Sequence, residues 1–356
     1  MKKNQLILGL VVLAAIAALV IWGRDRIHFD FHEFRVQLAM VDWRRIAIGL
    51  VCIYAAYVFR SLRWTYLLRH NKKLHPLSLL GTQVIGFTAV ALIGRVADPV
   101  RPYLVARKTG LPLSNQIAVY IVERLFDAGT MALIFSSAIL FATWFGSPGA
   151  MPHPELVKKT GYGGMAGTVA GALFLVAVRF AGNALAVFLE RTLGLLSKKI
   201  GQAVGHKVRE FRAGLDTMRS FGDFAAVAGL SIGMWLLIAA SYLETTRAFV
   251  ASPPLATMMP ANCVLLMVVS GLTSIVQLPV LGLFTQIGFV ATAISQFFGV
   301  APEAATACAA MLLLVTFLGI VPIGLIWAQI EHVSLRKVTV ESEHAEEDLE
   351  AAGAAE

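Results

Sequence analysis

Charged residues are scarce in this 356-residue chain, where Lys, Arg, Asp and Glu make up 15% of the sequence against 57% hydrophobic residues. A soluble domain usually carries about 25% charged residues, and the mean hydropathy here is +0.72. This deficit of charge argues against a soluble protein. Several apolar runs approach the roughly 20 residues that a membrane-spanning helix needs. The sequence therefore predicts an all-α fold, a polytopic transmembrane helix bundle.

Cysteine is also rare, and Cys52, Cys263 and Cys308 each lie inside an apolar stretch. The chain has no CxxC pair and no Cys/His cluster, which argues against a disulfide framework. The eight histidines are scattered and form no HExxH motif, and neither a phosphate-binding glycine loop nor a nucleophile elbow is present. We therefore expect no metal and no cofactor, and a nucleotide-driven pump is disfavoured.

The apolar runs divide the chain into a bundle, residues 1–335, and an acidic tail, residues 336–356. The last sixteen residues hold seven acids and no Lys or Arg, which is typical of a disordered segment. Within the bundle, residues 181–222 carry basic residues with apolar residues at helical spacing, which predicts amphipathic helices on the membrane surface. The predicted membrane segments are 5–22, 44–62, 78–93, 115–145, 162–180, 223–246, 259–277, 282–298 and 304–330.

Basic residues between the apolar runs predict the orientation of the chain. Residues 60–76 contain five Lys or Arg and residues 179–222 contain eight, whereas 146–161 contain two and 247–258 contain one. Cytoplasmic loops of membrane proteins carry the excess of Lys and Arg. The pattern places the first two loops in the cytoplasm. It predicts a multi-pass protein of the cell membrane, the inner or plasma membrane, with both termini cytoplasmic.

This orientation requires residues 78–113 to enter and leave the membrane on the same side. The two arms, 78–93 and 97–108, are each short for a crossing, so we predict a re-entrant helical hairpin enclosed by protein or by a water-filled cavity. A second Gly/Pro break, between 259–277 and 282–298, predicts another re-entrant turn, as in transporters with inverted repeats. The residues assigned to this second turn are Gln277, Pro279, Gly282 and Gln286.

Arg95, Asp98 and Arg101 form the first charged group. At a spacing of three they share one face of a helix, and two guanidiniums with one carboxylate suit a phosphate, because Arg binds phosphate oxygens in a bidentate manner. Pro99 follows Asp98, so Asp98 is predicted to cap a helix that begins at the proline. The alternative interpretation is a cytoplasmic loop with solvated charges.

The second charged group lies in YIVERLFDAG, residues 120–129. Tyr120, Glu123, Arg124 and Asp127 fall at helical spacing. Charges inside a membrane span are costly, and they are usually paired and functional. The alternative is that the charge-free run from Ala128 spans the membrane alone and leaves these charges at its cytoplasmic boundary.

Residues 94–127 read GRVADPVRPYLVARKTGLPLSNQIAVYIVERLFD. They resemble the flippase-like transmembrane family that includes the membrane region of bacterial lysylphosphatidylglycerol synthases. Residues of this chain that match the family's motifs are Gly94, Arg95, Arg101, Tyr103, Glu123, Arg124 and Asp127. The departures are Ile93 for proline, Ala97 for glycine and Asp98 for glutamate. Gln286 stands where a later motif of the family has a glutamate.

The resemblance implies a lipid flippase or translocase that binds an anionic, phosphate-bearing headgroup in a polar cavity within the membrane. The residues expected to bind the substrate are Arg95, Asp98, Arg101, Tyr103, Glu123, Arg124 and Asp127. No aminoacyl-transfer domain follows residue 335, so we expect no enzyme activity of that kind. Two alternatives stay open: a membrane-embedded transferase acting on a lipid phosphate, and a non-catalytic partner of a lipid-modifying enzyme. The expected partners are anionic membrane lipids and no nucleic acid, with homo-oligomerisation left open.

Overall fold

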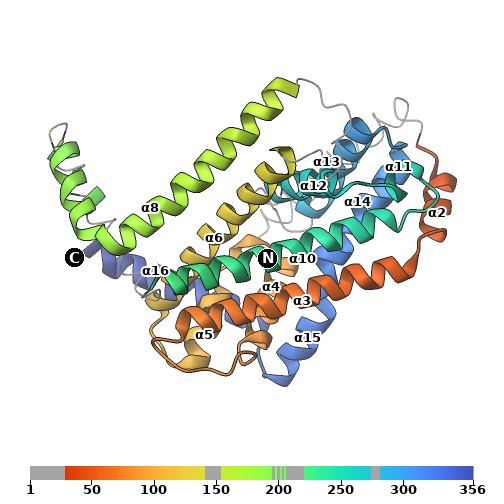
Figure 1. Cartoon of the computed structure of the whole chain (residues 1–356). Coiled ribbons are helices and arrows are strands. Elements are labelled where there is room, and N and C mark those ends of the chain that lie inside the picture. Colours follow the sequence, from red (N-terminus) through yellow and green to blue (C-terminus); the bar gives the residue numbers. More distant parts are fainter. Residues whose placement is uncertain are drawn as a thin grey trace.

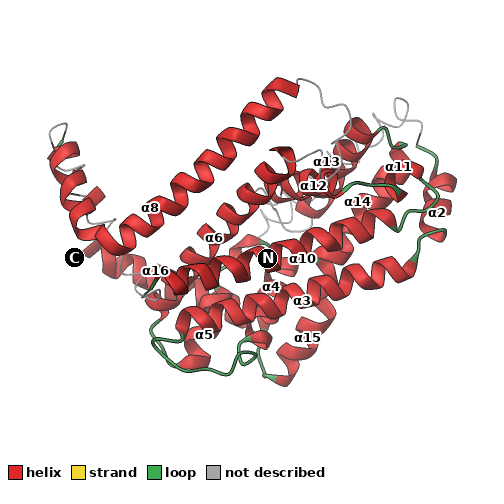
Figure 2. Ribbon diagram, viewed as in Figure 1, coloured by secondary structure: helices red, strands yellow, loops and turns green. Residues whose placement is uncertain are grey.

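A computed structural model describes residues 29–140, 154–194, 197–198, 201–202, 204–205, 220–273 and 281–355. Every regular element within these ranges is a helix (Figure 2). The helices are α2 (Phe31–Ala39), α3 (Trp43–Leu68), α4 (Leu80–Ile93), η1 (Arg95–Ala97), α5 (Val100–Thr109), α6 (Leu113–Leu140), α8 (Pro154–Gly194), α10 (Phe221–Arg247), α11 (Pro253–Ala256), α12 (Pro260–Thr273), α13 (Leu281–Phe298), α14 (Pro302–Thr316), η4 (Leu318–Ile320), α15 (Val321–Ile330) and α16 (Leu335–Ala355).

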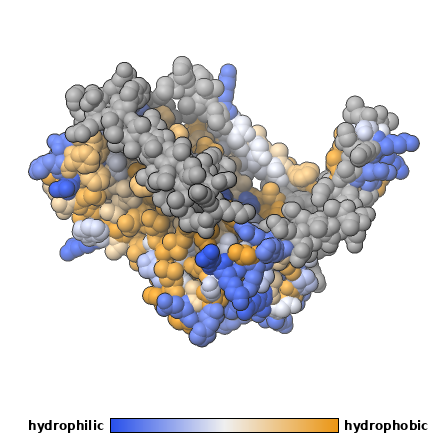
Figure 3. All heavy atoms as spheres, turned by 180° about the vertical axis from the view of Figure 1, so that it is seen from behind, coloured by the Kyte–Doolittle hydropathy of each residue, from blue (hydrophilic) through white to orange (hydrophobic). Residues whose placement is uncertain are grey.

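Among the described residues, three helical stretches are long and apolar enough to cross a membrane: α3, α10 and Pro302–Ile330, which combines α14, η4 and α15. The helices α4 and α12 and most of α13 are apolar but shorter. Where the face in Figure 3 is coloured, apolar residues form a broad area on its left side, and hydrophilic residues gather at the left edge, along the bottom and on the projecting arm. These features confirm the predicted all-α membrane protein. The predicted first segment, residues 5–22, lies outside the described residues.

Helices α3 and α10 lie side by side through the middle of the molecule (Figure 1). Glycines allow their close approach, because a side chain on Gly49 would meet Ser241 and Thr245, and one on Gly233 would meet Phe59. Helix α10 also packs against α12 and α14, and α6 packs against both α10 and α12. The helices α6, α10 and α12 therefore form a mutually packed group beside the central pair.

The chain between α3 and α6 forms the predicted helical hairpin. Helix α4 ends at Gly94, whose φ of 96° suits glycine, and α5 returns to pack against α4. At 14 and 10 residues, the arms extend about 21 and 15 Å, short of a hydrocarbon core of about 30 Å. Asp98 does not cap α5 as predicted, because the N-cap position is Pro99 and no side chain bonds to it.

The second predicted turn is described only in part. Gly282 is the second residue of α13 and Gln286 lies one turn further along the same helix, so neither residue forms a turn. Both are buried, and the Nε2 of Gln286 donates to the Oγ of Ser270 on α12 at 2.6 Å. Helices α12 and α13 do pack against each other. Gln277 and Pro279 lie outside the described residues.

The C-terminal segment is helical, so the predicted disorder of residues 336–356 is wrong for the part that is described. Val338 and Ser342 are 2% and 1% exposed, and α16 packs against η1, α5 and α4. Helix α8 runs from Pro154 to Gly194 against α6, with a kink at Ala181. The kink coincides with the predicted boundary between the span at 162–180 and the surface segment that begins at residue 181.

Candidate functional site

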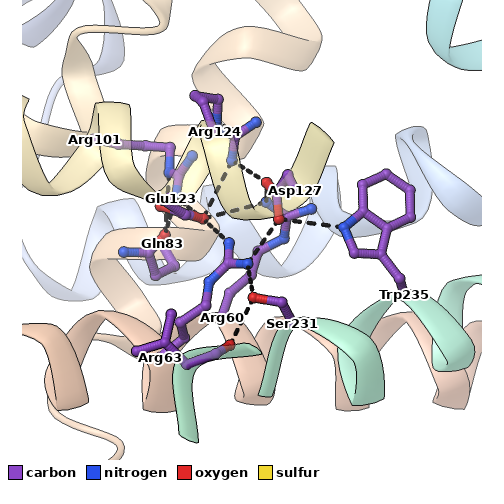
Figure 4. Close-up of polar contacts among 10 residues, drawn as sticks. Arg60, Arg63, Gln83, Arg101, Glu123, Arg124, Asp127, Ser231 and Trp235 are labelled. Carbon is purple, nitrogen blue, oxygen red and sulfur yellow. Dashed lines mark hydrogen bonds and ion pairs between the residues drawn. The ribbon is translucent and has the colours of Figure 1, made fainter. Parts of the chain in front are cut away.

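Glu123 and Asp127 lie one helical turn apart on α6 and are 1% and 6% exposed. Four guanidinium groups from three helices converge on these two carboxylates (Figure 4). They belong to Arg60 and Arg63 of α3, Arg101 of α5 and Arg124 of α6. We call these four arginines and two acids the arginine cluster.

Arg63 links both carboxylates to α10. Its Nη2 donates to Glu123 Oε1 at 2.6 Å, and its Nη1 donates to Asp127 Oδ1 at 2.7 Å and to Ser231 Oγ at 2.8 Å. The side chain is 1% exposed. Hydrogen bonds to ionised groups are stronger than neutral ones, so Arg63 fixes α3, α6 and α10 to one another.

Arg101 fastens the hairpin to the same acid. Its Nη2 lies 2.7 and 3.0 Å from the two oxygens of Glu123, and its Nε and Nη2 both donate to Gln83 Oε1 on α4. A glycine makes room for this side chain, because a Cβ on Gly86 would collide with the Cγ of Arg101. The polar contacts of Arg101 therefore join α4, α5 and α6.

Arg60 and Arg124 are more exposed than Arg63 and Arg101, and their closest contacts with the two carboxylates are longer. Arg60 is 11% exposed, and its Nη1 lies 3.6 Å from Glu123 Oε1 and 3.8 Å from Asp127 Oδ2. This buried nitrogen makes no hydrogen bond within the described chain. Arg124 is 37% exposed and pairs with the same two oxygens at 3.2 and 2.9 Å. Arg60 and Arg124 thus share the same two acceptor oxygens, and Arg124 is accessible from the surface of the protein.

Aromatic rings surround the guanidiniums. The Arg101 guanidinium lies 4.4 Å from the centre of the Phe87 ring, which Arg60 approaches at 4.5 Å. The Tyr120 ring lies 5.4 Å from Arg101 and 5.2 Å from Arg124. Such contacts favour a cation by about 0.5–2 kcal/mol. The rings therefore offset part of the cost of removing these charges from water.

The charges in the cluster do not balance. Four arginines against two carboxylates leave a net charge of +2. Burying charge without compensation is unfavourable, so the site is suited to an anion of one or two charges. Among the described residues, no group of three or more His, Cys, Asp or Glu side chains is placed to hold a metal ion.

The structure brings together four of the predicted site residues, Arg101, Glu123, Arg124 and Asp127. The other three make their closest contacts elsewhere, although Asp98 lies near enough to Arg124 to interact with it electrostatically. Arg95 and Asp98 pair with each other at 3.7 Å and are 44% and 29% exposed, so the expected grouping of both with Arg101 is wrong. Tyr103 donates instead to Glu341 of α16 at 3.2 Å.

Other residues of the cluster are absent from the sequence prediction. Arg60 and Arg63 were expected in a cytoplasmic loop, but α3 continues to Leu68, which buries Arg63 and partly buries Arg60. Their spacing of three from one another is the one sequence signal that could have paired them on a helical face. The remaining polar contacts come from Gln83, Ser231 and Trp235, whose Nε1 donates to Asp127 at 3.2 Å. Uncharged side chains such as these carry no pattern in a single sequence.

The fold and the cluster define a helical membrane protein with a buried, net cationic site. The chain belongs to the family described as lysylphosphatidylglycerol synthase TM region, which it matches over residues 6–324. This assignment confirms the resemblance drawn from residues 94–127 and links the chain to lipid metabolism. No curated protein and no solved structure matches the chain.

Proposed function

We propose that this protein binds an anionic, phosphate-bearing lipid and moves it across the membrane without modifying it. The observation that carries the proposal is the net charge of +2 in the arginine cluster, together with an accessible Arg124 and a buried Arg60 nitrogen that lacks a hydrogen bond. A phosphate monoester or diester carries one or two negative charges and several acceptor oxygens, which match these donors. Membership of a family linked to lipid metabolism supports a lipid as the phosphate's carrier.

The geometry divides the arginines by role. Arg63 and Arg101 are 1% exposed and donate to acceptors within the protein, so they hold the carboxylates in place. Arg60 and Arg124 each have a donor without an acceptor in the described chain and are more exposed than Arg63 and Arg101, so they would contact the phosphate. Direct contact is therefore assigned to Arg60 and Arg124, of which only Arg124 was among the residues that the sequence predicted to bind the substrate.

A transferase is less well supported. A general base needs a carboxylate that is free to take up a proton. Glu123 lies within 3.6 Å of four guanidiniums, and Asp127 accepts from Arg63 and Trp235. Both acids are thus engaged in ion pairs, so binding and translocation fit this site better than proton transfer.

The test uses the full chain reconstituted in phosphatidylcholine vesicles that contain a trace of fluorescent phosphatidylglycerol. Dithionite quenching of the outer leaflet measures how fast the label crosses. We expect Arg124→Gln to slow the crossing at least fivefold. Arg107→Gln serves as the matched control, because Arg107 is also exposed but lies outside the cluster, and it should stay within twofold of the wild type.

Equal rates for Arg124→Gln and the wild type would overturn the proposed role of the cluster. A wild-type rate no faster than in empty vesicles would overturn translocation. Binding is followed in parallel as the rise in melting temperature when phosphatidylglycerol is added, since a ligand that binds only the folded state stabilises it. We also propose that the protein resides in the inner or plasma membrane with both termini cytoplasmic, which a reporter fused to either end would check.

A further inference from the structure

A cavity of about 410 Å³ lies between α6, α10 and α12. Its volume is in the range of about 300–1,000 Å³ typical of ligand sites. Its walls are apolar apart from Ser137, and small residues such as Ala138, Ala240 and Ala261 leave the space open. With so few polar groups, the cavity offers nothing to orient a water-soluble ligand, and it suits a hydrocarbon.

The cavity and the arginine cluster share one face of α6. Glu123, Asp127, Ile134 and Ala138 follow one another at offsets of four, seven and four, so their side chains lie on the same side of the helix. The first two belong to the cluster and the last two line the cavity. The seven residues from Asp127 to Ile134 correspond to about 10 Å along the axis. One helical face is thus charged at one end and apolar at the other.

Helix α10 also borders both regions, but on adjacent sides of the helix rather than along one face, because consecutive residues point about 100° apart. Ser231 accepts a hydrogen bond from Arg63, and Trp235 donates one to Asp127. The residues that follow them in the sequence, Ile232 and Leu236, line the cavity. Leu236 is 54% exposed, so the cavity wall reaches the surface of a helix that is long and apolar enough to span a membrane. A chain in the surrounding lipid could therefore enter sideways, between the helices.

We propose that this cavity holds an acyl chain of the same lipid whose phosphate is bound by Arg60 and Arg124. This inference rests on the proposed function and extends it, because it makes the site recognise both parts of an amphiphile. The phosphate lies among the arginines, Trp235 stands between the two regions, and the chain runs along α6 toward α12. The substrate class is then a lipid phosphate with a chain long enough to reach past Asp127.

The experiment compares two phosphatidic acids, one with oleoyl chains and one with hexanoyl chains, for binding to the full chain in detergent by native mass spectrometry. Ala240→Phe fills the cavity. We expect it to weaken binding of the dioleoyl lipid at least tenfold and to leave the dihexanoyl lipid within twofold. The control is Ala225→Phe, an exposed position on the same helix, which should change neither.

Arg124→Gln separates the two hypotheses. It should weaken binding of both lipids, because it acts on the phosphate. If it leaves both unchanged while Ala240→Phe remains selective, the phosphate site of the proposed function fails and the chain site stands. If Ala240→Phe and Ala225→Phe bind the dioleoyl lipid equally well, the chain site is refuted, whatever Arg124→Gln does.

A second measurement needs no substitution and so does not depend on how a variant folds. A phosphatidic acid with a diazirine at the end of one acyl chain is photolysed on the wild-type protein, and the labelled peptides are sequenced. We expect labels on residues 133–138 and 260–264, which line the cavity. Labels confined to other parts of the surface would contradict the proposal.

Discussion

Glu123→Gln tests how far the arginine cluster depends on its central acid. The substitution keeps the shape of the side chain but removes its charge, so the buried net charge rises from +2 to +3. Glu123 is 1% exposed and lies 2.6 Å from Arg63, 2.7 Å from Arg101 and 3.2 Å from Arg124. Breaking a buried ion pair by removing one partner costs about 3–5 kcal/mol. We expect a loss of this size in the free energy of unfolding.

The assay is thermal unfolding in detergent, followed by intrinsic fluorescence. An unfolding entropy of about 2.1 cal/mol/K per residue over 356 residues converts the loss into a fall of about 4–7 °C. Arg124→Gln is the comparison, because Arg124 is 37% exposed. Its removal costs about 1 kcal/mol or less and also lowers the excess charge, so its melting temperature should fall by no more than about 1–2 °C.

A double variant checks the cause. Glu123→Gln combined with Arg101→Gln restores the net charge to +2, so its melting temperature should lie above the value expected if the two single losses added. Strict additivity, or a fall of less than 1 °C for Glu123→Gln alone, would refute the view that unbalanced buried charge sets the stability of this region.

Three further outcomes are expected. Gly86→Val forces Arg101 out of position and should lower the free energy of unfolding by about 1–3 kcal/mol. In the control Gly129→Ala, the added Cβ meets no atom within 4 Å, so the free energy of unfolding should fall by less than about 0.5 kcal/mol or rise. Equal melting temperatures for the two variants would contradict the proposed role of Gly86. Trp235→Phe removes the indole donor to the cluster and should cost about 1 kcal/mol in thermal unfolding. Val338→Asp places a charge at a buried position of α16, which should loosen the packing of α16 on α5 and speed hydrogen exchange in α5. Unchanged exchange would show that α16 does not stabilise α5.

The hairpin and four of the six residues of the cluster could be predicted because local rules determine them. Gly94 and the prolines after it mark a chain reversal that no long helix tolerates. The spacing of Glu123, Arg124 and Asp127 marks a charged helical face. These signals depend on neighbouring residues, so one sequence is enough to find them.

The other two residues of the cluster depend on contacts between distant parts of the chain. Arg60 and Arg63 follow an apolar run, where basic residues usually flank a span, and their partners lie about sixty residues further on. The prediction of disorder in the C-terminal tail failed for a different reason. It relied on the acidic composition of the tail and did not take into account the helical pattern of the same segment. Leu335, Val338 and Ser342 recur at spacings of three and four, which is typical of a packed helical face.

The distance in sequence between Arg63 and Glu123 has a consequence for synthesis of the protein. Arg63 of α3 leaves the ribosome sixty residues before Glu123, the acid that neutralises its charge. Each arginine placed alone at the centre of a membrane span costs up to about 2.5–3.5 kcal/mol. At about 5–20 residues per second, the partner arrives about 3–12 s later. We therefore expect the arginine end of α3 to wait at the water interface and to enter the bilayer together with α6.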